Sequence, residues 1–181
     1  MNLAAASPSL SEEELIARAQ GGDRAAYGEL IRRHRRGVVN VVYRMCGDAA
    51  LAEDAAQETF IKAWEHLAGY QPRSAFRNWL YRIATNQALS YLRREKPSVD
   101  VEKVVLRDPA TGPERQAEQS ERAETVRQAV LALPPASRTT LILREYEGLS
   151  YQEIADTLDI PMGTVMSRLN YARQRLRETL A

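Results

Sequence analysis

The chain has 181 residues, which is enough for one domain of medium size or for two small ones joined by a linker. Hydrophobic residues make up 44% of it and charged residues 27%, so a packed core is feasible, while the net charge of +1 gives no overall indication of a nucleic-acid partner. One cysteine excludes an intrachain disulfide, no Cys/His cluster has metal-ligand spacing, and no apolar run approaches the roughly 18 residues of a membrane span. The first residues lack the basic start and apolar run of a signal peptide, so we expect a cytoplasmic protein without metal or cofactor.

Helical signals follow one another along the first half of the chain. Ser11 and Glu14 have the spacing of a capping box, in which a hydroxyl and a carboxylate satisfy the backbone of the first turn. Residues 21–23 (GGD) and 47–48 (GD) each predict the end of one helix and the start of the next. A further helix is expected from Ser74, as its N-cap, to about Arg94.

Residues 96–122 differ in composition from the segments on either side. They contain three prolines, no aromatic residue and mixed charge, which predicts a linker. The helical pattern resumes near Glu121, breaks at Leu133–Pro135, and predicts a helix from about Ser137 to Glu147 before two short ones. We therefore predict an all-α protein of two small helical domains, whose relative orientation stays open. The expected parts are a tail (1–10), a first domain (11–95), the linker (96–122) and a second domain (123–181).

The last two helical segments have the pattern of a helix-turn-helix. Ser150 and Glu153 form a second capping box, and residues 158–161 (LDIP) supply the turn. Residues 164–177 then contain four arginines and no acid, a composition that suits a helix in the major groove, where Arg pairs with guanine and Asn with adenine. A plain helical hairpin with a solvated basic face is the alternative. The outward face is expected to carry Thr164, Ser167, Arg168, Asn170, Tyr171, Arg173 and Arg175.

Residues 71–94 combine five arginines with aromatic side chains and contain no Asp or Glu. Arginine neutralises phosphate, and aromatic rings stack on bases that have left a duplex, each stack contributing about 1–3 kcal/mol. Composition leaves two interpretations open, namely single-strand binding and an ordinary amphipathic core helix. Phe76 and Trp79 are expected in the core. The polar side is expected to hold Arg77, Asn78, Tyr81, Arg82 and Asn86.

Residues 48–65 are acidic, with five carboxylates against one base, Lys62. Such a face repels phosphate and suits a basic protein partner, although the pattern alone favours an ordinary solvated face. No Gly-rich phosphate loop, carboxylate pair or Ser/His/Asp arrangement stands out, which favours a binding protein over an enzyme.

Two separate sets of motifs resemble the extracytoplasmic-function (ECF) sigma factors of bacterial RNA polymerase, within the sigma-70 superfamily. Residues 54–64 (DAAQETFIKAW) and 76–86 (FRNWLYRIATN) resemble region 2 of that family. Residues 133–135 (LPP), 150–155 (SYQEIA) and 163–169 (GTVMSRL) resemble region 4. The resemblance covers about Ser11 to Leu180, and its order and spacing across two domains make it specific.

The resemblance implies a transcription initiation factor that binds core RNA polymerase and promoter DNA and has no catalytic site, cofactor or small-molecule substrate. An anti-sigma factor is a further partner that the family implies. Region 2 would hold the −10 element as melted non-template strand, through Tyr70, Ser74, Phe76, Arg77, Asn78, Trp79, Tyr81, Arg82 and Asn86. Region 4 would read the −35 element as duplex, through Thr164, Ser167, Arg168, Asn170, Tyr171 and Arg173. Polymerase would bind Asp54, Gln57, Glu58, Lys62 and Trp64.

The alternative function is a stand-alone helix-turn-helix regulator, which would need a dimerisation element and a sensor domain, and neither is recognisable. Several positions depart from the family pattern. Asp159 stands where the turn often has Gly, but Asp tolerates a left-handed backbone, so the turn is expected to form. Met166 stands where a basic residue is frequent, and Asn170 and Tyr171 replace residues that are commonly aromatic or basic. No relative's −35 sequence can therefore be carried over.

Overall fold

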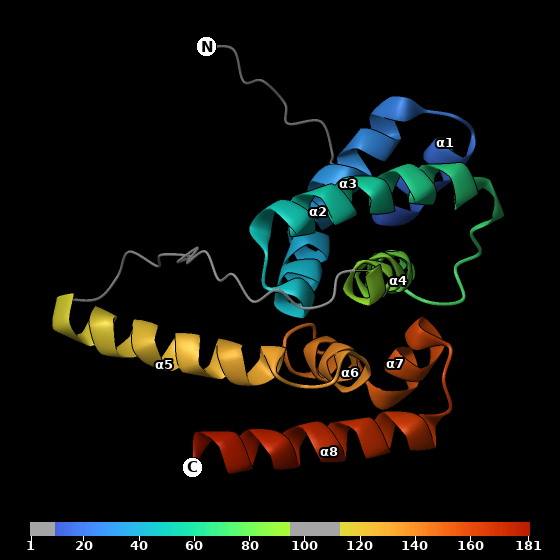
Figure 1. Ribbon diagram of the computed structural model, residues 1–181. Coiled ribbons are helices and arrows are strands. Elements are labelled where there is room, and N and C mark those ends of the chain that lie inside the picture. The colour runs from blue at the N-terminus through green and yellow to red at the C-terminus, as the bar shows by residue number, and fades with distance from the viewer. Residues whose placement is uncertain (1–9, 95–112) are drawn as a thin grey trace.

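The computed structural model describes residues 10–94 and 113–181, and Figure 1 shows an all-helical arrangement in two stacked groups. This confirms the predicted fold class. No helix in the described ranges is both long enough and apolar enough to cross a membrane. The described helices are α1 (Glu12–Gln20), α2 (Arg24–Cys46), α3 (Ala49–His66), the 3-10 turn η1 (Leu67–Gly69), α4 (Phe76–Arg94), α5 (Pro113–Leu131), α6 (Pro135–Glu145), α7 (Tyr151–Leu158) and α8 (Met162–Leu180).

Most helix boundaries follow the capping signals in the sequence. Both capping boxes form: Ser11 with Glu14, and Ser150 with Glu153, exchange hydrogen bonds between side chain and backbone. Asp159 adopts the left-handed conformation, with φ 54° and ψ 52°, and its N–H donates to the carbonyl of Ala155. The helix-turn-helix turn therefore tolerates Asp in place of Gly, as expected.

Three boundaries differ from the sequence pattern. α4 begins at Phe76, so Ser74 is not its N-cap; the Ser74 carbonyl instead accepts a hydrogen bond of 2.9 Å from the Tyr70 hydroxyl. α5 begins at Pro113, before the expected start near Glu121. α6 runs from Pro135 rather than Ser137, because proline lacks an N–H that the first turn would leave unpaired in any case.

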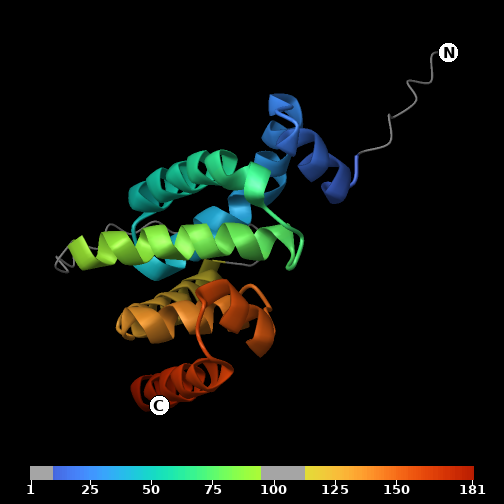
Figure 2. The same cartoon turned by 90° about the vertical axis from the view of Figure 1, so that its right-hand side faces the viewer.

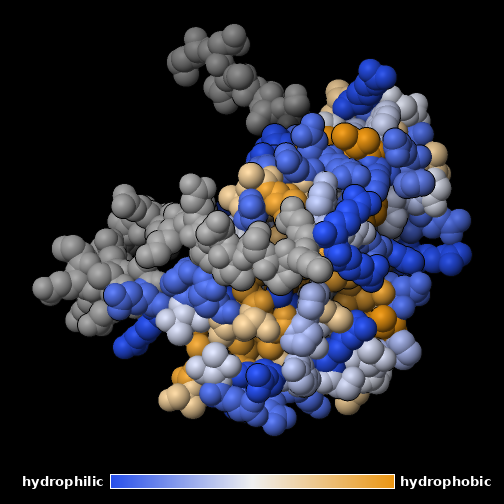
Figure 3. Space-filling model, in the orientation of Figure 1, coloured by the Kyte–Doolittle hydropathy of each residue, from blue (hydrophilic) through white to orange (hydrophobic). Residues whose placement is uncertain are grey.

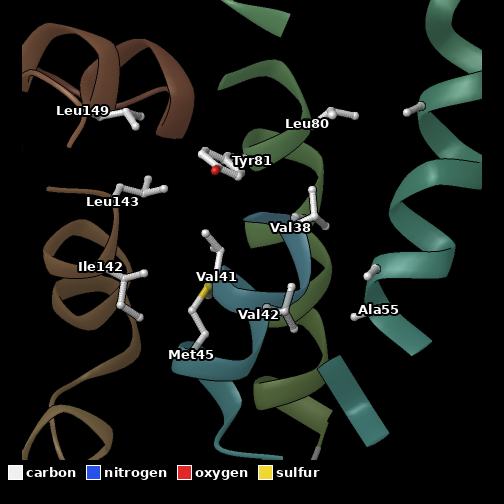
Figure 4. Close-up of a cluster of buried hydrophobic side chains, with 14 of the residues drawn as sticks. Val38, Val41, Val42, Met45, Ala55, Leu80, Tyr81, Ile142, Leu143 and Leu149 are labelled. Carbon is white, nitrogen blue, oxygen red and sulfur yellow. The ribbon is translucent and has the colours of Figure 1, made fainter. Parts of the chain in front are cut away.

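The N-terminal group consists of α1–α4, with α2 as its central helix. Val38 and Val42 of α2 pack with Ala55 of α3 and Leu80 of α4, and all four are fully buried (Figure 4). α2 and α4 approach closely at Gly37, where a side chain would lie 2.7 Å from the hydroxyl oxygen of Tyr81.

The C-terminal group consists of α5–α8, with α8 packed against α6 and α7. Val165, Leu169 and Ala172 form the buried face of α8 and have no exposed surface. The spacing of four and three residues places them on one side of the helix, so the opposite side stays open to solvent. Figure 3 shows hydrophobic surface gathered at the level of α6, between α4 and α8, and a mostly hydrophilic edge along α8.

The two groups share one hydrophobic core. Figure 2 shows α4 lying between α3 above and α6 and α7 below. In Figure 4, Val41, Met45 and Tyr81 of the N-terminal group face Ile142, Leu143 and Leu149 of the C-terminal group. Five of these six side chains have no exposed surface and Tyr81 is 5% exposed. Burial of these apolar side chains stabilises the contact between the two groups. The gain in free energy is roughly 25 cal/mol for each square ångström of apolar surface removed from water.

A buried arginine joins the two groups at the end of this core. Arg138 of α6 is 8% exposed, and its guanidinium donates hydrogen bonds to the carbonyls of Leu131, Leu133 and Met45. Leu131 is the last residue of α5, Leu133 lies in the turn before α6, and Met45 lies in the last turn of α2. Burial lowers the pKa of Arg138, because the charged form has lost its water. The Met45 carbonyl, at the negative end of the α2 dipole, and the carbonyls of Leu131 and Leu133 replace that water.

A Thr157→Val variant is expected to raise the free energy of unfolding by about 1 kcal/mol. The Thr157 side chain is 4% exposed, and among residues 10–94 and 113–181 its buried hydroxyl has no hydrogen-bond partner. Valine has the same shape and removes that unsatisfied group. Urea denaturation measures the change. The matched control is Thr139→Val, which removes a hydroxyl that donates to the Pro135 carbonyl at 2.8 Å. Equal effects of the two substitutions would contradict the prediction.

Candidate nucleic-acid and protein interfaces

A cluster of aromatic side chains supports the start of α4. The ring centroids of Tyr70, Phe76 and Trp79 lie 4.9–5.5 Å from one another, in tilted and edge-to-face arrangements. Tyr70 and Phe76 are buried and Trp79 is partly exposed. The prediction that Phe76 and Trp79 lie in the core is therefore confirmed for Phe76, whereas Trp79 is only partly buried. Gln20 donates two hydrogen bonds, of 3.0 and 2.9 Å, to the carbonyls of Leu67 and Tyr70, which fixes the loop before α4 onto α1.

The polar residues of α4 divide into an exposed set and a covered set. Arg77, Arg82 and Asn86 are exposed, as the sequence predicted. Asn78 and Tyr81 are buried, at 2% and 5% exposure, because α6, α7 and the loop between them lie over this face. The sequence prediction of a solvent-exposed polar side is therefore wrong for these two residues in this conformation.

Three acidic residues of the C-terminal group contact the covered face. The Tyr81 hydroxyl donates to Glu147 at 2.5 Å, the Asn78 amide donates to Glu153 at 3.1 Å, and Arg82 lies 3.4 Å from Asp159. Burial, and then the hydrogen bond to Glu147, raises the pKa of Tyr81. Hydrogen bonds from Ser150 and then Asn78 lower the pKa of Glu153. The sequence placed Glu153 in a capping box and Asp159 in the turn but predicted none of these three contacts, because no local pattern links the acids to a helix about seventy residues away.

α8 presents a basic, hydrogen-bonding face to solvent. Ser167, Asn170 and Tyr171 are exposed, and Thr164 and Arg168 are partly exposed. Arg173, from the same predicted set, pairs with Glu145 of α6 at 2.8 Å and also contacts the Tyr151 hydroxyl, so α6 holds its guanidinium. Met162 and Met166 add exposed apolar surface at the start of the helix, at 43% and 48%. Such a face can contact both phosphates and base edges of duplex DNA.

An apolar groove of about 620 Å³ with charged edges lies between α2 and α3. Three of the five residues predicted for a protein partner line it, namely Asp54, Gln57 and Trp64. The other two, Glu58 and Lys62, turn toward α4: Glu58 accepts a hydrogen bond of 3.1 Å from Tyr91, and Lys62 donates one of 2.8 Å to Gln87.

Sequence reasoning missed the apolar floor of this groove. Tyr27, Ile31 and Phe60 line it, and Ile61 stands on its edge with 53% of its surface exposed. The signal was present, because Ile61 is an isoleucine on the face of α3 that carries Gln57, one helical turn away. An apolar groove with acidic residues along one side fits a helical partner with basic residues.

Comparisons with known proteins match two separate regions of the chain to two family models. Residues 30–97 match sigma-70 region 2, and residues 123–176 match sigma-70 region 4. The RNA polymerase sigma-H factor of Pseudomonas aeruginosa is 38% identical, with 93% of each chain covered. The ECF RNA polymerase sigma factor SigE of Mycolicibacterium smegmatis is 40% identical over 88% of this chain and 65% of its own length. The ECF RNA polymerase sigma-E factor of Escherichia coli K12 is 36% identical, with 94% of each chain covered.

Solved structures share the same fold. CnrH, in its complex with the cytosolic domain of CnrY, matches with a TM-score of 0.71 and 27% identity, covering 93% of this chain and 96% of CnrH. The sigma factor RpoE of Bartonella quintana, in complex with the anti-sigma factor NepR, matches with a TM-score of 0.67 and 24% identity over 85% of this chain and 96% of RpoE. With two family regions in the expected order and relatives that match nearly end to end, the chain belongs to the ECF sigma factors of the sigma-70 family, which bind RNA polymerase and direct promoter-specific initiation of transcription.

Proposed function

We propose that this sigma factor reads its promoter with two separate surfaces, α4 for the melted −10 strand and α8 for the −35 duplex. The division follows the two units predicted from the sequence, residues 11–95 and 123–181, with 96–122 between them. The observation that carries the proposal is the contrast between two basic faces. α4 has arginines beside an aromatic cluster, a combination that suits unstacked bases, whereas α8 follows a helix-turn-helix turn, which suits duplex.

On α4, the exposed residues Arg77, Arg82 and Asn86 are proposed to contact the strand directly. The aromatic cluster supports the loop on which Ser74 is exposed. Because this surface fits bases only after they leave the duplex, its binding shifts the equilibrium toward the open promoter. Unstacking costs a few kcal/mol per base, and the contacts on α4 must return a similar amount.

On α8, the proposed reading residues are those that the fold leaves open on the side opposite Val165, Leu169 and Ala172. Arg168 suits a guanine edge and Asn170 an adenine edge, while Thr164 and Ser167 suit phosphate. Arg173 is proposed to contact DNA only when its guanidinium leaves Glu145 and pairs with a phosphate instead.

The groove between α2 and α3 is the proposed polymerase site. Its apolar floor and the acidic residues Glu53, Asp54 and Glu65 on its α3 side suit a basic helical element of the core enzyme. Arg24 and Arg35 line the α2 side, where Arg35 pairs with Glu53 at 2.5 Å. Glu58 and Lys62 are proposed to act indirectly, because their contacts with α4 fix α3 in place. Polymerase supplies the chemistry of RNA synthesis, so the chain itself is proposed to have no enzymatic activity and to work in the cytoplasm with the polymerase.

An anti-sigma factor is a proposed further partner. Two solved relatives with the same overall fold are complexes, CnrH with the cytosolic domain of CnrY and RpoE with the anti-sigma factor NepR. A protein that occupied either promoter-reading surface would block initiation by competition with DNA.

Run-off transcription with core polymerase and a library of promoters tests the whole proposal. The factor is expected to direct specific initiation with core polymerase and to bind duplex DNA only weakly by itself. Tight, specific duplex binding without polymerase would instead support a stand-alone helix-turn-helix regulator. The selected sequences would give both promoter elements in one experiment.

An Asp54→Lys variant is expected to bind core polymerase about tenfold more weakly, because it places a positive charge on the edge of a groove proposed to hold a basic helix. Glu13→Lys, on the exposed side of α1, carries the same change in charge and is the matched control. Fluorescence anisotropy of the labelled factor measures both affinities. Equal loss in the two variants would show that net charge, and not the groove, sets the affinity.

A further inference from the structure

The start of α8 carries two exposed methionines that the promoter-reading residues proposed above do not include. Met162 and Met166 have 43% and 48% of their surface exposed. A single exposed apolar side chain is common on a protein surface and needs no explanation. Here two of them occupy adjacent turns of one helix, on a face whose other side chains carry hydroxyl, amide and guanidinium groups. The pair therefore differs in chemistry from the contacts assigned to the rest of α8.

The helix-turn-helix places this pair where base edges are read. α8 is the second helix of the motif, and Met162 is its first residue. In helix-turn-helix proteins the N-terminal residues of the second helix enter the major groove and contact base edges. Neither methionine belongs to the buried side of α8, which consists of Val165, Leu169 and Ala172. Both side chains are therefore free to meet DNA when the helix enters the groove.

Met162, Met166 and Asn170 form one row along α8. Their spacing of four residues places successive side chains one above another on the same face of the helix. All three are exposed. Neighbouring members lie about 6 Å apart along the helix axis, and one base-pair step spans about 3.4 Å. Neighbours in the row can therefore contact base pairs that lie one or two steps apart.

The chemistry of methionine selects one partner among the groups that line the major groove. A thioether has no charge and no hydrogen-bond donor, so it gains nothing from phosphate oxygens or from the acceptor atoms of guanine and adenine. The apolar group that a base presents in the major groove is the C5 methyl group of thymine. Methionine is unbranched and rotates about three side-chain bonds, so it adapts to a methyl group whose position varies with the local shape of the duplex.

We propose that Met162 and Met166 read the C5 methyl groups of thymines in the −35 element. The inference rests on the proposed −35 role of α8 and names the bases that the start of this helix selects. Asn170, to which adenine is assigned, continues the same row, so the row as a whole selects A·T pairs. A basic side chain in place of Met166 would contact phosphate or guanine instead, so this departure from the family pattern changes which base is preferred.

The test removes the methyl group from the DNA and leaves the protein unchanged. Holoenzyme made of core polymerase and the full chain, below saturation, transcribes a promoter obtained from the run-off selection. Each thymine of the −35 element is replaced in turn by deoxyuridine, which lacks only the C5 methyl group and keeps the hydrogen-bonding edge. Transcription is expected to fall about fourfold at one or two neighbouring positions, which is the effect of one buried methyl group. The other thymines should not respond.

Protein variants assign the sensitive positions to the two methionines. Met162→Ala and Met166→Ala should each make one position indifferent to the methyl group, because its apolar partner is gone. Met166→Leu should keep the response, since leucine is also apolar. Val126→Ala, which shortens an exposed apolar side chain on α5, is the matched control and should show the wild-type response.

5-Methylcytosine carries the same methyl group, and a second set of templates separates it from thymine. A C·G pair at a sensitive position is expected to gain about fourfold on methylation, because the methyl group returns to the same place in the groove. A gain from methylated cytosine without any response to deoxyuridine would identify methylated cytosine as the ligand and overturn the assignment to thymine.

A wild-type profile without a deoxyuridine-sensitive position would overturn the inference. The proposed −35 role of α8 would still stand if Arg168→Ala/Asn170→Ala lowers transcription on the same templates, and both ideas would fail if it does not. A deoxyuridine response that persists in both alanine variants would assign the effect to duplex shape, which also overturns the inference. Weaker binding of core polymerase by Met166→Ala, with an unchanged deoxyuridine response, would assign the methionines to a protein contact instead.

Discussion

An Arg77→Ala/Asn86→Ala variant is expected to lose about 100-fold of its specific run-off transcription on duplex promoters, since two polar contacts of about 1–2 kcal/mol each would disappear. Both side chains are exposed on α4, and no residue of the C-terminal group hydrogen-bonds to them in the described ranges, so the loss should not reflect a change in folding. The same variant should recover most of its activity on a template that is already melted at the −10 element, because the unstacking cost has been removed.

Two controls give this prediction its specificity. Arg94→Ala removes the same charge from an exposed position at the end of α4, outside the proposed surface, and should leave transcription within about twofold of wild type. Arg168→Ala/Asn170→Ala on α8 should lower transcription on duplex and pre-melted templates alike, because those residues are proposed to read paired DNA. Rescue of the α8 variant by melting, or no rescue of the α4 variant, would reverse the proposed assignment of the two surfaces.

An Arg138→Ala variant is expected to lose about 3 kcal/mol of unfolding free energy and to uncouple the two halves of the molecule. Alanine would leave the carbonyls of Met45, Leu131 and Leu133 without their buried donor and would open a cavity beside the shared core. Both tryptophans, Trp64 and Trp79, lie in the N-terminal group. Their fluorescence therefore follows that half alone, whereas circular dichroism follows all helices.

Urea titration with the two probes checks this expectation. In the wild type the two transitions should coincide, since one core and one arginine span both groups. In Arg138→Ala they should separate. Arg122→Ala, on the exposed side of α5, is the control and should give coincident transitions at the wild-type midpoint. Coincident but shifted transitions in Arg138→Ala would mean that Arg138 stabilises the fold without joining its halves.

Local rules predicted much of this fold because its helix ends are set by neighbours in sequence. A Ser and a Glu three residues apart satisfy the backbone of one turn wherever the helix sits, and both capping boxes form. The left-handed Asp159 follows from the conformational freedom of one residue type. Ser74 failed as an N-cap because its carbonyl takes part in a loop that Tyr70 and Gln20 fix, and those contacts depend on packing.

The sequence by itself determined that the chain is all-α, that it carries a helix-turn-helix and a basic aromatic helix, and that its motifs follow the order of ECF sigma factors. Periodicity, capping and residue type are enough for these statements, since each depends on residues within a few turns of one another. Only the tertiary structure decided that Asn78 and Tyr81 are covered, that Glu58 faces α4 while Gln57 faces a groove, and that Arg138 spans the two halves. Those outcomes depend on contacts between residues some 30 to 90 positions apart, and the free energy of such contacts comes from burial and pairing that no local pattern encodes.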